Sequence, residues 1–338
     1  MSSSSVPITM QALYSSESTD PSAKTPFTLS LSSIPVPAEL PTSHALIRIK
    51  AAGLNPSDAL NAFQHPFPTA IKPQIMGRDF SGIIVSIAND ASPPSDWKVG
   101  DEVYGTGADY LSFTSPGVHA EYVLVPFFAL ARKPENLSFE QAGVVGVPYT
   151  AALAALKRAG IASEKTVLIV GATGSVGKAA VNIARGVYGC RVITASRHDE
   201  TDVNTTKDPG FEGVSRLTGG KGVDIALDVA GAKAGMEAAI KVLAVNGRYV
   251  FIAAGNGGTE VTFDARNLYR KNLGILGVMA VDIKEMTLLM GEMKGWFEEG
   301  KLQPPDEREF EKVNIEQALE KYPEVLKLAK KKWVIVFD

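Results

Sequence analysis

The order of hydrophobic and polar residues differs between the first 145 residues and the rest of the chain. Before residue 145, short apolar runs are separated by Pro, Gly and Ser residues that favour turns, as in His44–Ala52, Phe80–Ile87 and Glu121–Val125. Apolar runs bounded by turn residues are typical of strands. We therefore predict a β-rich first part.

From about Pro148 onward, short apolar runs alternate with stretches that have a helical period. Strands are predicted at Thr166–Val170, Arg191–Ala195, Asp224–Asp228, Arg248–Ala254 and Leu273–Met279, with a helix at Val176–Val187. This alternation is typical of an α/β fold in which a parallel sheet is doubly wound.

Two more helices and a last strand are predicted toward the C-terminus. The helices cover Asp282–Gly300 and Ile315–Leu328, where apolar residues recur at helical spacing, and the strand covers Trp333–Phe337. We interpret the run Lys330–Lys332 as a solvated end, because short charge runs usually face water.

Three glycines connect the first strand of the alternating part to its helix. Gly171, Gly174 and Gly177 follow one another at intervals of three residues. Glycine permits the tight turn and the close approach of backbone amides to a pyrophosphate, and the helix start adds free N–H groups and a positive dipole end. The pattern predicts a dinucleotide site. Its cradle contains Gly171, Thr173, Gly174, Ser175, Val176 and Gly177.

The residues after the second strand of this part indicate which dinucleotide is bound. An NAD enzyme places an Asp or Glu here, on the adenosine ribose, whereas this chain has Ser196 and Arg197. A hydroxyl and a guanidinium suit a 2′-phosphate, so we predict NADPH as the cofactor. Ligands of parallel sheets sit at the carboxyl ends of the strands. Further cofactor contacts are therefore expected from Ala230, Ala253, Gly255, Gly277 and Val278.

Composition limits the class of protein and of partner. The 338 residues suggest two domains, and a net charge of −3 gives no basic surface for nucleic acid. Neither a leader pattern nor a membrane-spanning apolar segment is evident, so we expect a cytoplasmic protein with a small-molecule substrate and no membrane partner. The single cysteine, Cys190, excludes a thiolate zinc cage. The histidines His44, His65, His119 and His198 are scattered, and we expect them at the surface or the core edge, with no metal site.

Seven short motifs follow one another along almost the whole chain. They are Asn55-Pro56-Ser57-Asp58, Gly77-Arg78-Asp79-Phe80-Ser81-Gly82, Val99-Gly100-Asp101-Glu102-Val103, His119-Ala120-Glu121-Tyr122, Pro148-Tyr149-Thr150-Ala151, Gly222-Val223-Asp224 with Asp228, and Gly247-Arg248-Tyr249-Val250. In this order they resemble the medium-chain dehydrogenase/reductase superfamily, specifically its zinc-free quinone oxidoreductase and enoyl reductase branch. The resemblance implies a GroES-like substrate domain at 1–145, completed by 301–338, and a Rossmann NADP-binding domain at 146–300. It also implies a homodimer.

The resemblance also implies a chemistry. Zinc alcohol dehydrogenases of the superfamily carry a Cys where this chain has Asn55–Asp58, and a His-Glu pair where it has Arg78–Asp79. This chain lacks both features. Without a Lewis acid, the reaction expected is hydride transfer from NADPH to a quinone or an α,β-unsaturated carbonyl. Asn55 and Asp58 are the implied catalytic residues, and Thr150 is placed near the nicotinamide.

Two departures from the family pattern concern the proton donor and the adenosine pocket. The tyrosine that many enoyl reductases carry is missing from Leu60–Phe67. This leaves Tyr149 and Tyr110 as candidate replacements, each also readable as structural, and protonation by solvent as the alternative. The segment 197–207 is too short for a full crossover helix. Two alternative functions therefore stay open: a trans-acting enoyl reductase of a biosynthetic pathway, and a non-catalytic nucleotide-binding or structural module.

Overall fold

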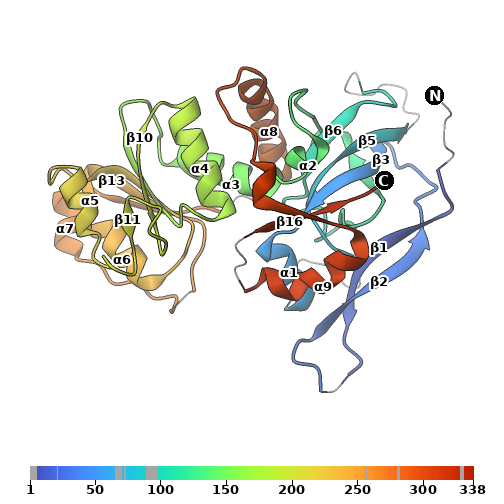
Figure 1. Cartoon of the computed structure of the whole chain (residues 1–338), viewed down its shortest axis with the longest axis horizontal. Coiled ribbons are helices and arrows are strands. Elements are labelled where there is room, and N and C mark those ends of the chain that lie inside the picture. Colours follow the sequence, from blue (N-terminus) through green and yellow to red (C-terminus); the bar gives the residue numbers. More distant parts are fainter. Residues whose placement is uncertain are drawn as a thin grey trace. The chain divides into compact units, whose positions relative to one another are not determined.

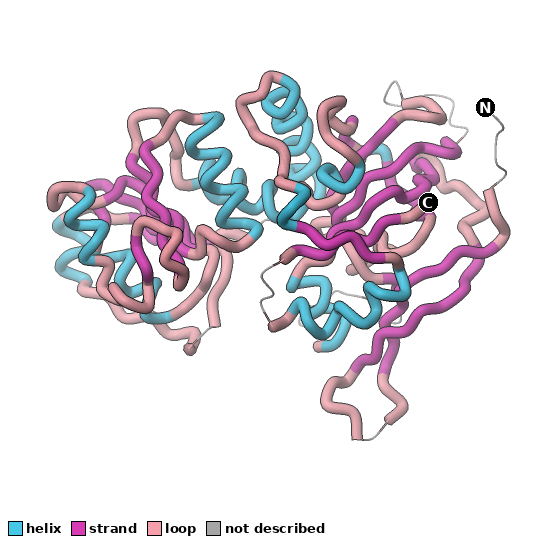
Figure 2. Tube along the Cα trace, in the orientation of Figure 1, coloured by secondary structure: helices cyan, strands magenta, loops and turns pink. Residues whose placement is uncertain are grey.

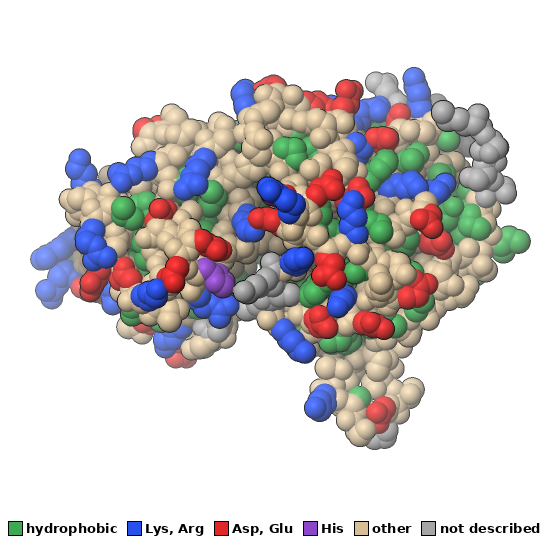
Figure 3. All heavy atoms as spheres, in the orientation of Figure 1, with side chains coloured by type: hydrophobic (Ala, Val, Ile, Leu, Met, Phe, Trp, Pro, Cys, Tyr) green, Lys and Arg blue, Asp and Glu red, His purple; other side chains and the backbone are tan. Residues whose placement is uncertain are grey.

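The computed structural model describes residues 6–20, 22–64, 71, 74–88, 97–255, 257–279, 282–327 and 331–338. The chain forms two compact units. Met1–Val147, Val281–Glu299 and Pro304–Asp338 make up the first, and Pro148–Ala280 with Gly300–Gln303 make up the second (Figure 1). None of the helices in the described ranges is long and apolar enough to cross a membrane. On the face shown in Figure 3, basic and acidic side chains are interspersed.

The first unit is built on two sheets, in agreement with the predicted β-rich part. In the described residues, the larger sheet has seven strands in the order β15-β16-β3-β5-β6-β8, with β7 paired to β3, and the smaller has the order β2-β1-β4. The strands are β1 (Thr9–Glu17), β2 (Phe27–Pro35), β3 (His44–Gly53), β4 (Gln74–Ile75), β5 (Asp79–Ile87), β6 (Glu102–Thr106), β7 (Tyr122–Pro126), β8 (Ala131–Arg132), β15 (Phe310–Val313) and β16 (Lys332–Val336).

The first unit also contains helical elements. They are α1 (Pro56–Phe63), η1 (Phe127–Ala129), α2 (Phe139–Ala142), α8 (Ile283–Glu298), η3 (Glu307–Glu309) and α9 (Ile315–Val325). Capping boxes start three of them, α1, α2 and α9. Ser138 and Gln141 exchange backbone and side-chain hydrogen bonds at α2, and Asn314 and Gln317 do so at α9.

Helix α8 lies in the first unit, whereas the predicted domain boundary at residue 300 placed it in the second. Its buried face, which includes Met290, Met293 and Phe297, packs on β6 and β8. The Tyr104 hydroxyl of β6 donates a hydrogen bond of 2.6 Å to the Met290 carbonyl. An amphipathic pattern shows that a helix buries one face, but not which sheet receives it.

The second unit confirms the predicted doubly wound parallel sheet. Figure 2 distinguishes its strands from its helices by colour. In the described residues, six parallel strands follow the order β11-β10-β9-β12-β13-β14. They are β9 (Thr166–Val170), β10 (Arg191–Ser196), β11 (Val203–Asn204), β12 (Val223–Asp228), β13 (Leu243–Phe251) and β14 (Gly274–Gly277). The helical elements are α3 (Gly146–Arg158), which enters from the first unit, α4 (Ser175–Asn182), η2 (Ile183–Val187), α5 (Glu212–Leu217), α6 (Lys233–Lys241) and α7 (Ala265–Arg270). Leu168, Ile193 and Tyr249 of the strands pack with Met236 and Ile240 of α6 in the core.

The connection from β10 to β11 contains no helix, as the short segment 197–207 led us to expect. Side-chain hydrogen bonds attach this connection to β10. The carboxylate of Asp202 accepts the backbone N–H of Thr194 at 2.8 Å and its hydroxyl at 2.7 Å. Such side-chain bonds to the backbone stabilise a polar loop without a helix.

Two helical glycines predict opposite effects of the same substitution. A Cβ at Gly186, in the π-helical turn η2, would lie 2.3 Å from the Lys301 carbonyl oxygen, whereas a Cβ at Gly295 in α8 meets nothing within 4 Å. We expect Gly186→Ala to lower the free energy of unfolding by about 1–3 kcal/mol. Gly295→Ala should raise it by about 0.5–1 kcal/mol, because alanine loses less backbone entropy. Urea denaturation of both variants checks this, and effects of the same sign would contradict it.

Candidate functional site

The glycine turn after β9 uses its three glycines in different ways. Gly171 has a φ of +86°, which favours glycine, and its N–H donates to the Ala195 carbonyl at 2.8 Å. A Cβ at Gly177 would lie 2.1 Å from the Gly171 carbonyl oxygen, so only glycine fits. At Gly174 a Cβ would meet only that same oxygen, at 3.5 Å. The backbone at Gly174 is thus open at the start of α4, whose first N–H groups have no partner inside the helix.

The loop after β12 is held by a buried carboxylate. Asp228 Oδ1 accepts the backbone N–H groups of Ala230 at 2.8 Å and Gly231 at 3.0 Å, and Oδ2 accepts the Tyr249 hydroxyl at 3.1 Å. Burial raises the pKa of Asp228, and the hydrogen bonds from Gly231, Ala230 and Tyr249 oppose that rise. Ala230, predicted as a cofactor residue, is therefore positioned by Asp228, which sequence reasoning named only as part of a motif.

The other residues predicted at strand ends occupy neighbouring positions of the sheet. Ala253 and Gly255 follow β13, Gly277 ends β14 and Val278 follows it. The Val278 N–H donates to the Phe251 carbonyl at 2.9 Å, which ties these two strand ends together. Because β12, β13 and β14 are adjacent and parallel, their carboxyl ends form one edge.

Ser196 and Arg197 differ in how free their side chains are. The Ser196 hydroxyl is buried, accepts the His198 N–H at 3.0 Å and lies 3.2 Å from the Thr201 hydroxyl. It therefore serves the 197–207 loop. Arg197 is exposed. Of the two residues predicted for a 2′-phosphate, the guanidinium is the more available.

In the first unit, the predicted Asn55 and Asp58 are buried, with exposures of 3% and 1%. Asp58 Oδ2 accepts the Asn55 backbone N–H at 2.9 Å, which helps to start α1. Asp58 Oδ1 accepts the Arg78 Nε–H at 2.9 Å, and Arg78 also bonds to the Ser57 hydroxyl. Both oxygens of Asp58 are thus engaged, one of them in a buried ion pair.

The Asn55 carboxamide lies between a second anion and a second cation. Asn55 Nδ2 donates to Asp79 Oδ2 at 2.8 Å, and Lys332 Nζ donates to Asn55 Oδ1 at 2.8 Å. The other oxygen of Asp79 accepts the Val147 N–H at 2.8 Å. Burial raises the pKa of Asp79, and the nearby Lys332 ammonium opposes that rise. Together with Asp58 and Arg78, the cluster has two carboxylates and two cations.

Lys332 corrects one sequence interpretation. The run Lys330–Lys332 was expected to be solvated, and Lys331 is exposed, but the Lys332 ammonium bonds to Asn55 inside the unit. Lys330 lies outside the described residues. The antiparallel ladder explains the difference, since Val334 pairs with Gly53, and continuing this register by two places sets Lys332 opposite Asn55.

His119 is also more buried than expected, because it is fully covered. Its Nδ1 lies 2.5 Å from the Tyr322 hydroxyl of α9, and its Nε2 lies 3.3 Å from the Gly53 carbonyl oxygen. A carbonyl only accepts, so Nε2 carries the proton and Nδ1 accepts from Tyr322. Burial lowers the pKa of His119 to about 4. His65, another of the four histidines, lies outside the described residues.

The tyrosines considered as proton donors are spread over the two units. Tyr149 and Thr150 are buried in α3, within the second unit, whereas Tyr110 belongs to the first. The Tyr110 ring packs edge-on against Phe128, with centroids 6.4 Å apart. Residues 65–67 of the stretch Leu60–Phe67 lie outside the described residues.

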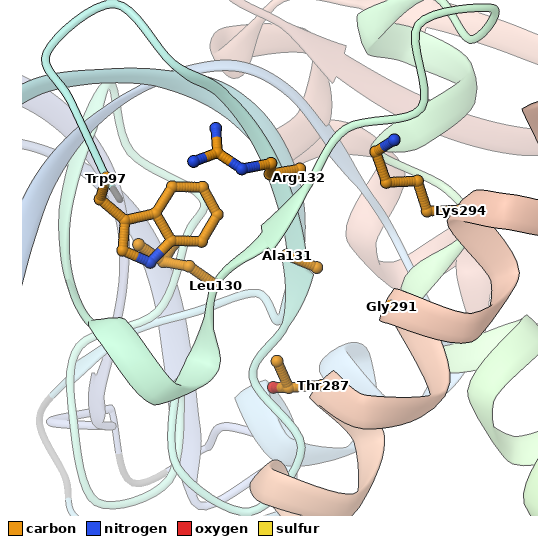
Figure 4. Close-up of a pocket in the computed structure, with 7 residues that line it drawn as sticks. All are labelled: Trp97, Leu130, Ala131, Arg132, Thr287, Gly291 and Lys294. Carbon is orange, nitrogen blue, oxygen red and sulfur yellow. The ribbon is translucent and has the colours of Figure 1, made fainter. Parts of the chain in front are cut away.

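No group of three His, Cys, Asp or Glu side chains in the described ranges is arranged to hold a metal ion. A hollow of about 410 Å³ in the first unit is lined by Trp97, Leu130, Ala131, Arg132, Thr287, Gly291 and Lys294 (Figure 4). Its cations already have partners: Arg132 bonds to Asp101 at 2.9 Å, and Lys294 bonds to Glu298 at 2.6 Å. Another hollow, of about 600 Å³, lies at the amino ends of β9 and β12, the opposite edge from the predicted cofactor residues. Neither hollow contains a predicted site residue.

The buried His119 predicts an acid-sensitive stability. Its folded pKa of about 4 lies below the ordinary value of 6.5, so the unfolded chain binds this proton first as the pH falls. The contribution of neutral His119 to the free energy of unfolding is therefore fully present above its ordinary pKa. It is lost as the pH falls from that value toward the folded pKa. When the pH is lowered from about 7.5 to about 5, we expect the free energy of unfolding to fall by about 2 kcal/mol because of His119. Urea denaturation at the two pH values measures this loss.

The control is His119→Gln, which keeps a donor and an acceptor but does not titrate. This variant should be less stable near neutral pH and should lose less stability on acidification. Equal losses in the two proteins would show that another group causes the acid sensitivity.

Comparison with known proteins connects this arrangement to a family. The family model "Alcohol dehydrogenase GroES-like domain" matches residues 41–135, and "Zinc-binding dehydrogenase" matches residues 175–294. A zinc-type alcohol dehydrogenase-like protein of Schizosaccharomyces pombe is 37% identical, over 92% of this chain and 93% of that protein. Human quinone oxidoreductase is 29% identical, over 73% of this chain and 74% of that protein.

A solved structure shares the fold. CurK enoyl reductase superposes with a TM-score of 0.75 at 20% identity, over 98% of this chain and 100% of that one. With the sequence relatives, this likeness accounts for the GroES-like first unit and the doubly wound second unit. The chain therefore belongs to the medium-chain dehydrogenase/reductase superfamily of oxidoreductases.

Proposed function

We propose that this protein is an NADPH-dependent reductase that transfers hydride to a quinone or an α,β-unsaturated carbonyl without zinc. The observation that carries the proposal is the buried ion pair of Arg78 and Asp58, at the positions where the zinc enzymes of the superfamily carry ligands. Both Asp58 oxygens already accept hydrogen bonds. The Arg78 guanidinium, whose Nε lies 2.9 Å from Asp58 Oδ1, would repel a metal cation at this carboxylate.

The second unit fits a dinucleotide. A side chain at Gly177 would fill the turn, Gly174 leaves the backbone open, and α4 begins there with free N–H groups. The residues that we assign to the cofactor are Thr150, Gly171, Thr173, Gly174, Ser175, Val176, Gly177, Ser196, Arg197, Ala230, Ala253, Gly255, Gly277 and Val278. When bound, NADPH supplies the hydride.

The chain's own contribution would be to bind the acceptor and to stabilise the negative charge that develops on its oxygen. Asn55 Nδ2 carries two N–H groups, and in the described residues Asp79 accepts one of them. We assign the second N–H to the acceptor oxygen. Asp58 holds Arg78 and the start of α1, and the buried Tyr149 is the candidate proton donor.

Turnover tests the proposed function directly. NADPH should quench or shift the intrinsic fluorescence, and its absorbance should then fall when a quinone or an α,β-unsaturated ketone is added. Treatment with a zinc chelator should leave the rate unchanged. No NADPH binding at millimolar concentration would contradict the reductase, and loss of activity on chelation would contradict the zinc-free mechanism. An enoyl thioester as a third acceptor distinguishes an enoyl reductase from a quinone reductase.

The cofactor preference is tested at Arg197. Because its exposed guanidinium is assigned to the 2′-phosphate, Arg197→Ala should raise the Kd for NADPH roughly tenfold, which corresponds to about 1.4 kcal/mol, and leave the Kd for NADH unchanged. Lys207→Ala is a matched control in the same loop, since Lys207 pairs with Asp199 at 2.6 Å. Equal weakening of both dinucleotides by Arg197→Ala would refute the assignment.

A further inference from the structure

The carboxamide of Asn55 is held at both ends by groups of opposite charge. Its oxygen accepts from the Lys332 ammonium at 2.8 Å, and its nitrogen donates to the Asp79 carboxylate at 2.8 Å. A flipped carboxamide would set its NH₂ group against the ammonium and its oxygen against the carboxylate. Both hydrogen bonds would then be replaced by repulsive contacts. The two charges thus select one orientation of the amide.

Lys332 is placed here by the fold. Strand β16 pairs with the end of β3, and the Leu54 N–H donates to the Trp333 carbonyl at 3.0 Å. A Cβ at Gly53 would lie 3.2 Å from Lys332 Cε and 2.8 Å from the Gly143 carbonyl oxygen. The absence of a side chain at Gly53 therefore leaves room for the stem of Lys332 where it reaches Asn55.

The charges around Lys332 come from two other segments of the unit. Burial lowers the pKa of Lys332 below its ordinary value. Asp79 at the start of β5 and Asp58 in α1 oppose this shift, and Arg78 adds to it. An amide that bridges a cation and an anion is polarised by both, because linked hydrogen bonds strengthen one another in a low-dielectric interior. The Lys332 ammonium on Oδ1 draws electron density out of the amide, and this makes the N–H groups of Asn55 better donors.

We propose that Lys332 is a positioning residue of the reaction, which fixes the Asn55 carboxamide so that Nδ2, not Oδ1, is presented to the acceptor oxygen. This role rests on the proposed reductase function. Lys332 acts through Asn55, so its contribution should disappear when the carboxamide is removed.

A double-mutant cycle tests this dependence. The proteins are the wild type, Lys332→Met, Asn55→Leu and the double variant, with Lys331→Met as the exposed control. We expect Lys332→Met to lower kcat by roughly tenfold to a hundredfold, because a misplaced group costs rate. The Kd for NADPH should stay within about twofold, because the glycine cradle belongs to the other unit. With Asn55→Leu already present, Lys332→Met should lower kcat no further.

The pH profile separates positioning from a packing role. Wild-type kcat should fall on the basic side as Lys332 loses its proton. Lys332→Arg keeps its proton to higher pH, so it should retain most of the activity and move this fall upward. An unchanged basic limb would overturn the proposal, as would equal effects of Lys332→Met with and without Asn55→Leu.

Urea unfolding of the same four proteins provides a readout that needs no turnover. If the wild type reduces no acceptor, the proposed function fails, and the catalytic role of Lys332 fails with it. The unfolding cycle still decides the contact itself. Non-additive losses of stability would show that Lys332 holds Asn55, and additive losses would show that it does not.

Discussion

The carboxylate of Asp79 is fully buried, and it joins segments that are far apart along the chain. It starts β5, accepts from Asn55 before α1, and accepts from Val147 at the beginning of α3. It also balances the charge of Lys332 in the last strand. A Cβ at Gly146 would lie 2.2 Å from its Oδ1, so the backbone there must pass without a side chain. The positions of Asn55, Val147 and Lys332 relative to one another therefore depend on the Asp79 carboxylate.

Buried charges come at an energetic cost, and the cluster offsets this cost by pairing. Desolvating one ion costs several kcal/mol, and removing one partner of a buried pair typically destabilises a protein by about 3–5 kcal/mol. Here Asp58 faces Arg78, and the Asn55 amide links Asp79 to Lys332. The arrangement therefore tolerates two carboxylates and two cations inside the first unit, and it holds the side chain to which we assign the acceptor.

In the second unit, backbone geometry and not charge pairing fixes the loops that we assign to the cofactor. Gly177 is required by the approach of the Gly171 carbonyl, and the loop after β12 is fixed by two N–H groups on Asp228. In both places the backbone is positioned and side chains are kept away. This suits a diphosphate, which backbone amides at a helix start can bind whatever the surrounding side chains are.

Local pattern was enough to predict much of this molecule. The β-rich and alternating parts, the strand-turn-helix at Gly171–Gly177 and the helix-free connection after Ser196 follow from residue spacing, because the side chains of strands, turns and helices repeat over a few residues. Motif resemblance likewise identified Asn55 and Asp58, which the structure brings into one cluster, although their chemical roles stay predictions.

Folding in three dimensions decided the rest. The burial of Lys332 and His119, and the assignment of α8 to the first unit, all depend on partners that are distant in the sequence. A lysine at the start of a strand is solvated or buried according to which residues of the neighbouring strand lie opposite it. That pairing arises only when β16 adds to β3, so the charge pattern of Lys330–Lys332 alone could not reveal it.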